Sequence, residues 1–177
     1  MKVMACVASG PSLNSEDCLA LRLSGIESIA VNSTWRAVPF SMAICAGDGD
    51  WWDRNAGEIP AGMRKFCFIP AVARRHSLEY FRGITPAPHN SGQRAIELAY
   101  TLGARRIILL GYDCSLQAGI HWHGPHEGMR NPTATSIAGW KREFFKTRLA
   151  LHDADIINCS RHTELGCFRS ASLQEVL

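Results

Sequence analysis

The sequence predicts an α/β fold with one open, mostly parallel sheet and helices on both of its faces. Short apolar segments rich in β-branched residues alternate along the chain with segments of helical periodicity. Several of these apolar segments are continuous rather than alternating, as in parallel strands that are covered on both sides. The chain has 177 residues, which suits one such domain and is too short for two. We therefore expect a single domain over residues 1–177.

Six segments are expected to form strands: Val3–Ala8, Ser28–Val31, Ser41–Cys45, Lys65–Ile69, Arg106–Leu110 and Asp155–Asn158. Three are expected to form helices: Ser15–Leu23, Ser91–Leu102 and Ser136–Leu151. The second helix is the clearest, because apolar residues recur at i, i+3, i+4 and i+7 between a capping Asn90 and a terminating Gly103. Helices placed between strands imply right-handed βαβ crossovers. Residues 48–62 and 114–135 fit neither pattern, and we expect long loops there.

The composition is that of an ordinary soluble protein, with 46% hydrophobic and 20% charged residues. Apolar runs are only a few residues long, far short of the ~20 that a membrane span needs. The first residues lack the apolar core and cleavage site of a signal peptide. The seven cysteines include no CxxC pair, so we expect reduced thiols rather than a zinc site or disulfides. Together these features predict a cytoplasmic protein without a membrane partner.

The net charge is +3, and no run of basic residues accompanies it. Non-specific nucleic-acid binding therefore has little electrostatic support, which leaves nucleic acid only a role as an acceptor. An anionic small molecule is the expected partner. The sequence leaves open whether the chain forms a homo-oligomer.

Small polar residues and glycines follow most of the expected strands. In an open parallel sheet, ligands bind beyond the carboxyl ends of the strands, near the point where the strand order reverses. The residues there that we expect to bind a nucleotide are Ser9, Gly10, Pro11, Ser12, Asn32, Ser33, Asp48, Gly111, Tyr112 and Ser160, with Asp113 as a candidate catalytic group. Glycine lets a ligand approach the backbone, and Ser and Asn hydrogen-bond to ribose, bases and phosphates. The same residue types also form plain turns, and their convergence on one edge favours binding.

The clearest helix opens with Asn90, Ser91 and Gly92. Helix N-termini have unpaired N–H groups and a partial positive charge, so they bind phosphates. Helix capping alone is an alternative explanation for Asn90 and Ser91. Neither the glycine-rich dinucleotide fingerprint nor a P-loop occurs in the chain, so a phosphate site here would be of another kind.

Three histidines lie close together in the second long loop, at His121, His123 and His126, and Glu127 follows them. Imidazoles in such a loop serve as a general base or as phosphate contacts. A His-x-His pair on an extended segment also places both rings on one side, as chelation requires, but no partner at zinc-site spacing follows. We therefore treat all three histidines as candidate catalytic residues and predict no metal site.

Five segments carry a family resemblance: Val7–Leu13 (VASGPSL), Asn32, Asn90–Gly92 (NSG), Leu110–Asp113 (LGYD) and Asn158–Ser160 (NCS). In this order they resemble the family-42 sialyltransferases, and equally the MptE-like (DUF115) Rossmann-like proteins, which include a 6-hydroxymethylpterin pyrophosphokinase. The resemblance runs from residue 3 to about residue 165. Short proteins of this kind are common in tailed-phage genomes, so the resemblance also fits a phage-encoded member.

The resemblance implies a Rossmann-like fold with a pocket for a nucleotide or sugar nucleotide. The residues that would hold the cytidine nucleotide in the sialyltransferase pattern are Ser9, Gly10, Asn32, Ser91 and Gly92. The chain departs from that pattern at Ser9, which replaces an Asn, and at Asn131-Pro132-Thr133, which stands where the family has its catalytic His. The family's pair of phosphate-binding tyrosines is missing from this loop, and only Tyr112 lies nearby.

Three functions follow as hypotheses. The first is a nucleotide-dependent transferase of glycosyl type, in which a loop histidine is the general base and Trp51, Trp52 or Trp122 stacks on a base or sugar. The second is a pyrophosphokinase that uses ATP, with Mg²⁺ held by Asp48, Asp50 and Asp113. The third is a non-catalytic protein that binds and sequesters a nucleotide. No further cofactor is expected.

Overall fold

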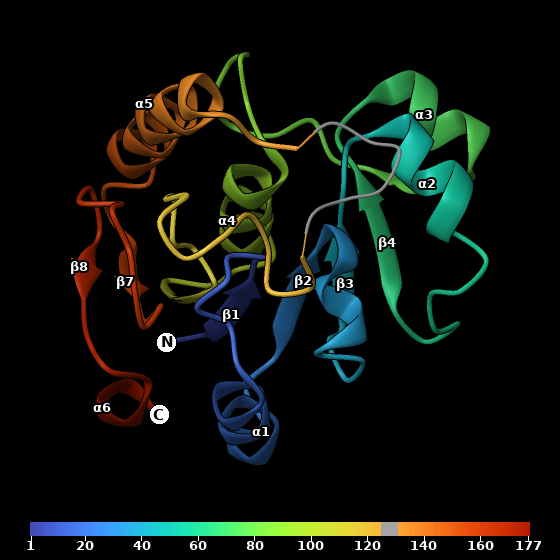
Figure 1. Cartoon of the computed structure of the whole chain (residues 1–177). Helices are drawn as coiled ribbons and strands as arrows, with labels where there is room; N and C mark the ends of the chain where they lie inside the picture. Colours follow the sequence, from blue (N-terminus) through green and yellow to red (C-terminus); the bar gives the residue numbers. More distant parts are fainter. Residues whose placement is uncertain (125–130) are drawn as a thin grey trace.

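The computed structural model describes residues 1–124 and 131–177. They form one sheet of eight strands in the order β5-β4-β3-β2-β1-β6-β7-β8 (Figure 1). The strands are β1 Val3–Val7, β2 Ser28–Val31, β3 Ala43–Cys45, β4 Arg64–Cys67, β5 Glu79–Tyr80, β6 Arg106–Leu110, β7 Asp155–Asn158 and β8 Arg169–Ser170. Each adjacent pair among them is parallel. The predicted α/β class is confirmed, with an open, parallel, Rossmann-like sheet.

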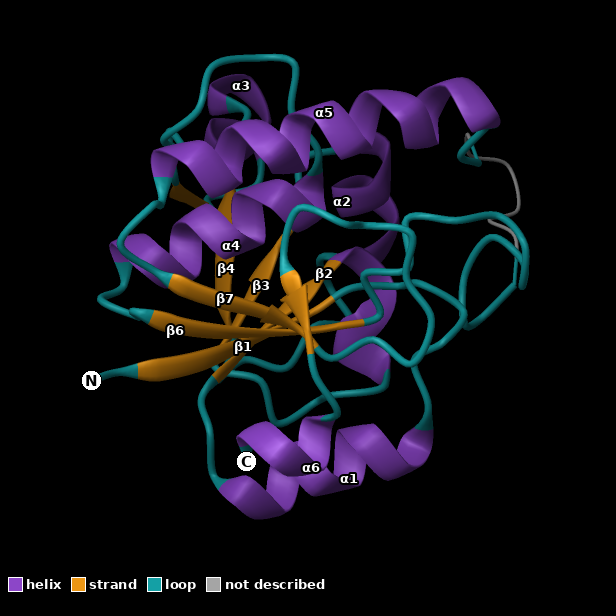
Figure 2. Ribbon diagram, turned by 90° about the vertical axis from the view of Figure 1, so that its left-hand side faces the viewer, coloured by secondary structure: helices purple, strands orange, loops and turns teal. Residues whose placement is uncertain are grey.

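Helices cover both faces of this sheet. They are α1 Ser15–Ser24, the 3₁₀ helix η1 Asn32–Arg36, α2 Gly49–Asn55, α3 Pro70–Arg75, α4 Ser91–Thr101, α5 Ala134–Ala150 and α6 Leu173–Val176. Helices α4 and α5 lie on one side of the sheet, and α1 and α6 lie on the other (Figure 2). Because strand residues alternate between faces, Met4 and Cys6 of β1 pack with α4, whereas Ala5 and Val7 pack with α1.

The direction of strand addition reverses at β1. From β1 the chain adds β2 to β5 toward one edge and then returns to place β6 on the other side of β1. When a right-handed crossover adds the next strand on one side of a sheet, its helix lies on one face, and when the next strand is added on the other side, the helix lies on the opposite face. The crossovers from β1 to β2 and from β6 to β7 run in opposite directions, which explains why α1 and α5 are on different faces. The loops after β1 and β6 therefore leave the sheet toward opposite faces, and such a divergence opens a crevice for a ligand.

All six predicted strands and all three predicted helices are present, with ends that differ from the predicted ones by at most two residues. The expectation of a plain loop over residues 48–62 is wrong, because α2 begins at Gly49. Asp48 caps this helix by accepting the N–H of Asp50 at 2.9 Å, and the buried Trp51 and Trp52 anchor it to the sheet.

Capping residues explain where the other helices begin and end. Asn14 accepts the N–H of Asp17 at 2.9 Å at the start of α1, and Gly25, with a φ of 70°, ends that helix. Thr133 caps α5, which has 17 residues. Within residues 1–124 and 131–177, no helix is long and apolar enough to cross a membrane.

Candidate functional site

A cavity lies at the carboxyl ends of β1, β2 and β6, where the strand order reverses. Its inner compartment, of about 130 Å³, is lined by Ala8–Pro11, Val31, Asn32, Asn90–Gly92, Gly111–Ser115, Ile120, His121, Trp140 and Phe144. An outer compartment of about 420 Å³ continues from it toward α2 and shares Asn32, Asn90, Ser91, His121 and Trp140 with it. The two adjoining compartments have the size of a small-molecule site, which is roughly 300–1,000 Å³.

Most of the residues predicted from the sequence meet at this cavity. Those that line it are Ser9, Gly10, Pro11, Asn32, Asp48, Asn90, Ser91, Gly92, Gly111, Tyr112, Asp113 and His121. The hydroxyls of Ser12, Ser33 and Ser160 are instead engaged by the protein. For example, Ser33 Oγ accepts from Trp51 Nε1 at 3.0 Å, and Ser160 Oγ accepts from the backbone N–H of Tyr112 at 2.7 Å. These three serines do not line the cavity, but each forms a hydrogen bond with a residue that does.

The loops after β1 and β6 are joined backbone to backbone beside the inner compartment. The N–H of Ala8 donates to Leu110 O, and the N–H of Gly10 donates to Gly111 O, both at 2.8 Å. Two glycines permit this approach. A Cβ on Gly10 would overlap Gly111 O, and a Cβ on Gly111, whose φ is 69°, would overlap Ala8 O. The junction therefore requires glycine at both positions.

Asp113 secures the same junction through its side chain. It is 1% exposed, and its carboxylate accepts the backbone N–H of Ser12 at 2.8 Å and the Ser12 hydroxyl at 2.5 Å. Burial raises the pKa of this carboxyl above its ordinary value of 3.8, and the hydrogen bonds from Ser12 oppose that rise. In this arrangement Asp113 positions the loop 9–12.

Asp113→Asn should change the pH dependence of stability. A carboxyl whose pKa is raised by folding binds its proton more tightly in the folded state, so its contribution is fully present below the ordinary pKa and is lost as the pH rises through the raised one. We expect the free energy of unfolding of the wild type, relative to Asp113→Asn, to fall as the pH rises above the ordinary pKa of the carboxyl. Urea titrations at several pH values measure this difference. A relative stability that increases with pH would contradict the assignment.

The backbone turns sharply where β2 reaches the cavity. Asn32 has a φ of 50°, a left-handed conformation that Asn adopts more readily than most residues. The Thr34 hydroxyl fixes the turn, because it accepts the N–H of Val31 at 2.8 Å and donates to Val7 O at 2.7 Å. Asn32 is thereby held in the wall shared by both compartments.

The N-terminus of α4 opens into both compartments. Asn90 caps this helix, and its Nδ2 donates to Glu143 Oε2 of α5 at 2.7 Å. The Tyr112 hydroxyl donates to Gly92 O at 3.0 Å and so holds the first turn in place. Helix geometry leaves the N–H groups of Ser91 and Gly92 without intrahelical partners, and both residues line the cavity. The positive end of the helix dipole therefore lies at the cavity wall.

The loop after β6 returns to the cavity at Ile120 and His121. His121 lines both compartments, and its Nδ1 is 3.1 Å from the Ser9 hydroxyl. The backbone N–H of Trp122 donates to Ser9 O at 3.0 Å. The ring of His123 stacks on that of His121, with centroids 5.1 Å apart, but His123 itself is exposed. The candidate His126 lies outside the described residues.

The tryptophans proposed for stacking separate into three environments. Trp51 lines the outer compartment. The proposal is wrong for Trp52, which is fully buried and donates from Nε1 to Ala46 O at 3.0 Å. Trp122 contributes to a separate groove beside α1.

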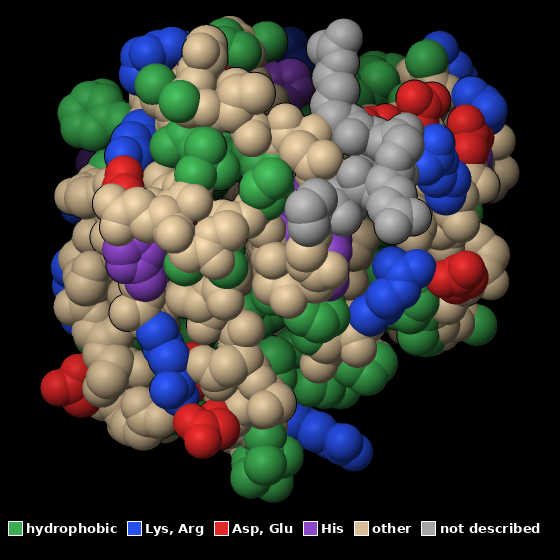
Figure 3. Space-filling view, viewed as in Figure 1, with side chains coloured by type: hydrophobic (Ala, Val, Ile, Leu, Met, Phe, Trp, Pro, Cys, Tyr) green, Lys and Arg blue, Asp and Glu red, His purple; other side chains and the backbone are tan. Residues whose placement is uncertain are grey.

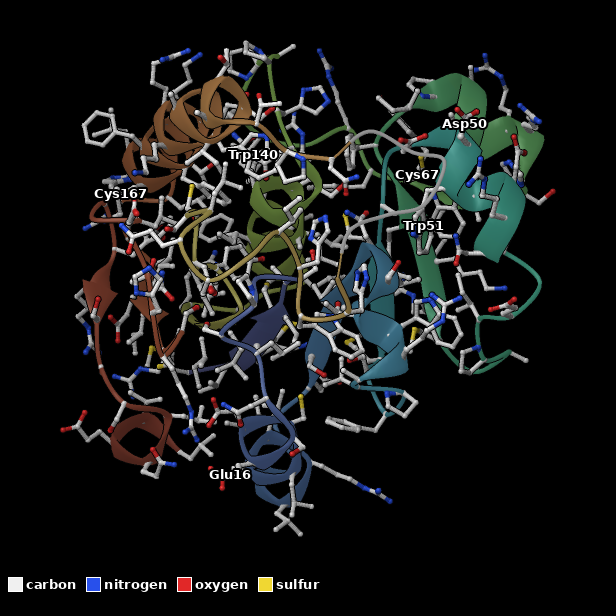
Figure 4. The ribbon with its side chains drawn as sticks, in the orientation of Figure 1. Glu16, Asp50, Trp51, Cys67, Trp140 and Cys167 are labelled. Carbon is white, nitrogen blue, oxygen red and sulfur yellow. The ribbon has the colours of Figure 1, made fainter. Side chains whose placement is uncertain are left out.

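The three carboxylates considered for Mg²⁺ are not brought together. Asp113 is bonded to Ser12, Asp48 caps α2, and Asp50 is exposed on α2, away from Trp140 (Figure 4). Among the residues that the structure describes, no group of three or more Asp, Glu, His or Cys side chains is arranged to hold a metal ion.

The sequence did not single out Trp140 or His89, which both line the cavity. Trp140 lies on α5 and is only partly buried. His89 precedes the cap of α4, and its ring edge contacts Phe68 with centroids 5.1 Å apart. Burial and the nearby Arg94 lower the pKa of His89. The sequence feature that could have identified His89 as a site residue is its position directly before the predicted phosphate-binding residues 90–92.

No protein-family model matches the chain, and no curated protein is significantly similar to it.

Proposed function

We propose that the protein is a nucleotide-dependent transferase of glycosyl type, which binds a nucleotide or sugar nucleotide in this cavity. The position of the cavity is the observation that carries the proposal: it lies where the strand order reverses, and the N-terminus of α4 opens into it. Open parallel sheets bind nucleotides at such a place, and helix N-termini bind their phosphates.

The chemistry of the wall suits the parts of a nucleotide. Trp140 offers aromatic surface on which a base would stack. Ser9 and Asn32 provide hydrogen-bonding groups for the ribose and the base edge. The N–H groups of Ser91 and Gly92 would bind the phosphate.

His121 is the acid–base group of the proposed reaction. The Ser9 hydroxyl orients its ring in the wall of the outer compartment, where a second substrate would lie. As the acceptor oxygen bonds to the transferred group, the imidazole would take the acceptor's proton. The bond between that group and the nucleotide phosphate would break at the same time, and its electron pair would pass to a phosphate oxygen beside α4.

A panel of nucleotides and sugar nucleotides tests the proposal, with binding followed by calorimetry and products by mass spectrometry. Glycosyl transfer that continues in EDTA would support it, and a preference for cytidine nucleotides would fit the family resemblance. Turnover of ATP only with Mg²⁺ would indicate a pyrophosphokinase instead. Binding without turnover, unchanged in His121→Ala, would identify a non-catalytic binding protein. Failure of every compound to bind would contradict a nucleotide site.

Trp140→Ala should weaken nucleotide binding by about fivefold to 150-fold, because stacking on a base contributes ~1–3 kcal/mol. Phe145→Ala is the matched control, since Phe145 is on the same helix but is 53% exposed and does not line the cavity. Calorimetry at a temperature where both variants are folded measures the dissociation constants. Equal affinity in the two variants would contradict a stacking role for Trp140.

A further inference from the structure

Among the residues that the structure describes, none of those that line the cavity is a Lys or an Arg. On the face drawn in Figure 3, the visible Lys and Arg side chains lie mainly toward the periphery. Two carboxyl groups, Asp48 and Asp113, are part of the wall, and α4 adds only a partial positive charge. Burying a phosphate there without a cation would cost free energy. Among the described wall residues, only His89 and His121 are able to supply a full positive charge.

His89 is held beside the expected phosphate position. It immediately precedes the cap of α4 and lines the outer compartment together with Asn90 and Ser91. Its ring meets Phe68 edge to face at 76°. Phe68 in turn packs against Gly47, where a Cβ would overlap the Phe68 ring. This edge-to-face contact positions the imidazole in the wall of the outer compartment.

The surroundings of His89 favour the neutral imidazole when no ligand is present. The charged and titratable groups around it are Arg94 and Glu97 of α4, Glu143 of α5, and Asp48 and His121 in the wall of the same compartment. Burial lowers the pKa of His89 most, Arg94 lowers it further, and the two glutamates offset only part of this effect. The Nδ1 atom has no hydrogen-bond partner among the described residues, so no acceptor there stabilises a second ring proton.

We infer that His89 takes up a proton when a phosphate group occupies the cavity, and that nucleotide binding therefore tightens as the pH falls. The inference rests on the proposed nucleotide site and adds the residue that balances the ligand's charge. A phosphate beside the ring adds its negative charge to that of the nearby glutamates, and it favours the imidazolium. Reciprocally, the protonated ring attracts the phosphate.

The test uses a ligand whose own charge does not change with pH. The probes are the methyl phosphodiesters of the four nucleoside 5′-monophosphates, which carry one negative charge on the phosphate between pH 5 and pH 8, and the free nucleosides are the uncharged controls. We expect the dissociation constant of the probe that binds to decrease steadily from pH 8 to pH 5, with about tenfold as the limit for a pKa difference of one unit between the bound and free states. The affinity of its nucleoside should not change. Proton NMR of the His89 ring should show a higher pKa with the probe bound than without it.

Three histidine variants locate the proton. His89→Gln should remove most of the pH dependence of probe binding. His152→Gln, at an exposed position after α5, is the control for losing a histidine and should behave as the wild type. Loss of the pH dependence in His121→Gln but not in His89→Gln would overturn the assignment. Probe binding that is independent of pH would refute this inference alone, whereas failure of all four probes to bind would refute the nucleotide site and the inference with it.

Discussion

Glu97→Ala is expected to lower the free energy of unfolding by about 3–5 kcal/mol, a large fraction of the roughly 5–15 kcal/mol that is typical of a folded domain. Glu97 is fully buried and pairs with Arg94, which is 3% exposed. The same carboxylate accepts the hydroxyls of Thr85 at 2.5 Å and Thr147 at 3.0 Å. The substitution would leave a buried guanidinium without its counter-charge and two buried hydroxyls without an acceptor.

The effect should also reach the cavity. Glu97 accepts the N–H of Ile84 at 2.7 Å, and Arg94 donates to Thr85 O at 2.8 Å, so the pair holds residues 84 and 85 against α4. This segment continues to His89 and Asn90 in the cavity wall. We therefore expect any folded Glu97→Ala protein to bind nucleotide more weakly than the wild type.

Glu79→Ala is the matched control for charge removal. Glu79 pairs with Arg64 at 2.6 Å, but both side chains are 45% exposed, and such surface pairs contribute less than about 1 kcal/mol. Urea unfolding of the two variants at one pH measures both free energies. A cost for Glu97→Ala no larger than that for Glu79→Ala would show that the buried pair does not stabilise this region.

Gly111→Ala is expected to abolish nucleotide binding and to lower the free energy of unfolding by roughly 3 kcal/mol or more. The φ of 69° is unfavourable for alanine, and the new Cβ would overlap the backbone oxygen of Ala8. Backbone atoms cannot rotate away as a flexible side chain can. The loops after β1 and β6 would have to separate, which would break the hydrogen bond from Gly10 N to Gly111 O and open the cavity wall.

Gly25→Ala is the matched control, because it introduces the backbone strain of a positive φ without steric overlap of the new Cβ. Gly25, at the end of α1, has a φ of 70°, but a Cβ there would meet no atom within 4 Å. Its replacement should cost only the left-handed conformation, about 1–2 kcal/mol, and leave nucleotide binding intact. Chemical denaturation and calorimetry on both variants measure the difference. If the two substitutions have the same effect, the junction of the two loops is not as tight as the structure indicates.

The long elements of the fold were predictable because each carries its own periodic signal and caps. The α4 sequence, for example, has its apolar stripe between Asn90 and Gly103. The two-residue strands β5 and β8 have no such signal, and their residues are exposed, so only pairing with β4 and β7 defines them. The short helix α2 was hidden because its cap, Asp48, and its first residue, Gly49, also suit a turn.

The location of the candidate site was predictable from topology, since parallel strands bring their carboxyl ends to one edge of the sheet. The direction of each side chain was not. Ser9 and Ser160 both follow strands, yet Ser9 lines the cavity and Ser160 bonds the backbone of Tyr112. Trp140 belongs to a helix whose orientation is decided by packing against α4, which a local pattern does not encode.

Backbone amide NMR with the nucleotide that binds most tightly tests the central claim most directly, because it shows where on the protein the ligand lies. A nucleotide in the cavity should shift the amides of Gly10, Asn32, Ser91 and Gly92, with the largest changes at the first turn of α4. The largest shifts at the groove beside α1, which Leu19, Phe40 and Trp122 line, with no change at Ser91 and Gly92, would contradict it.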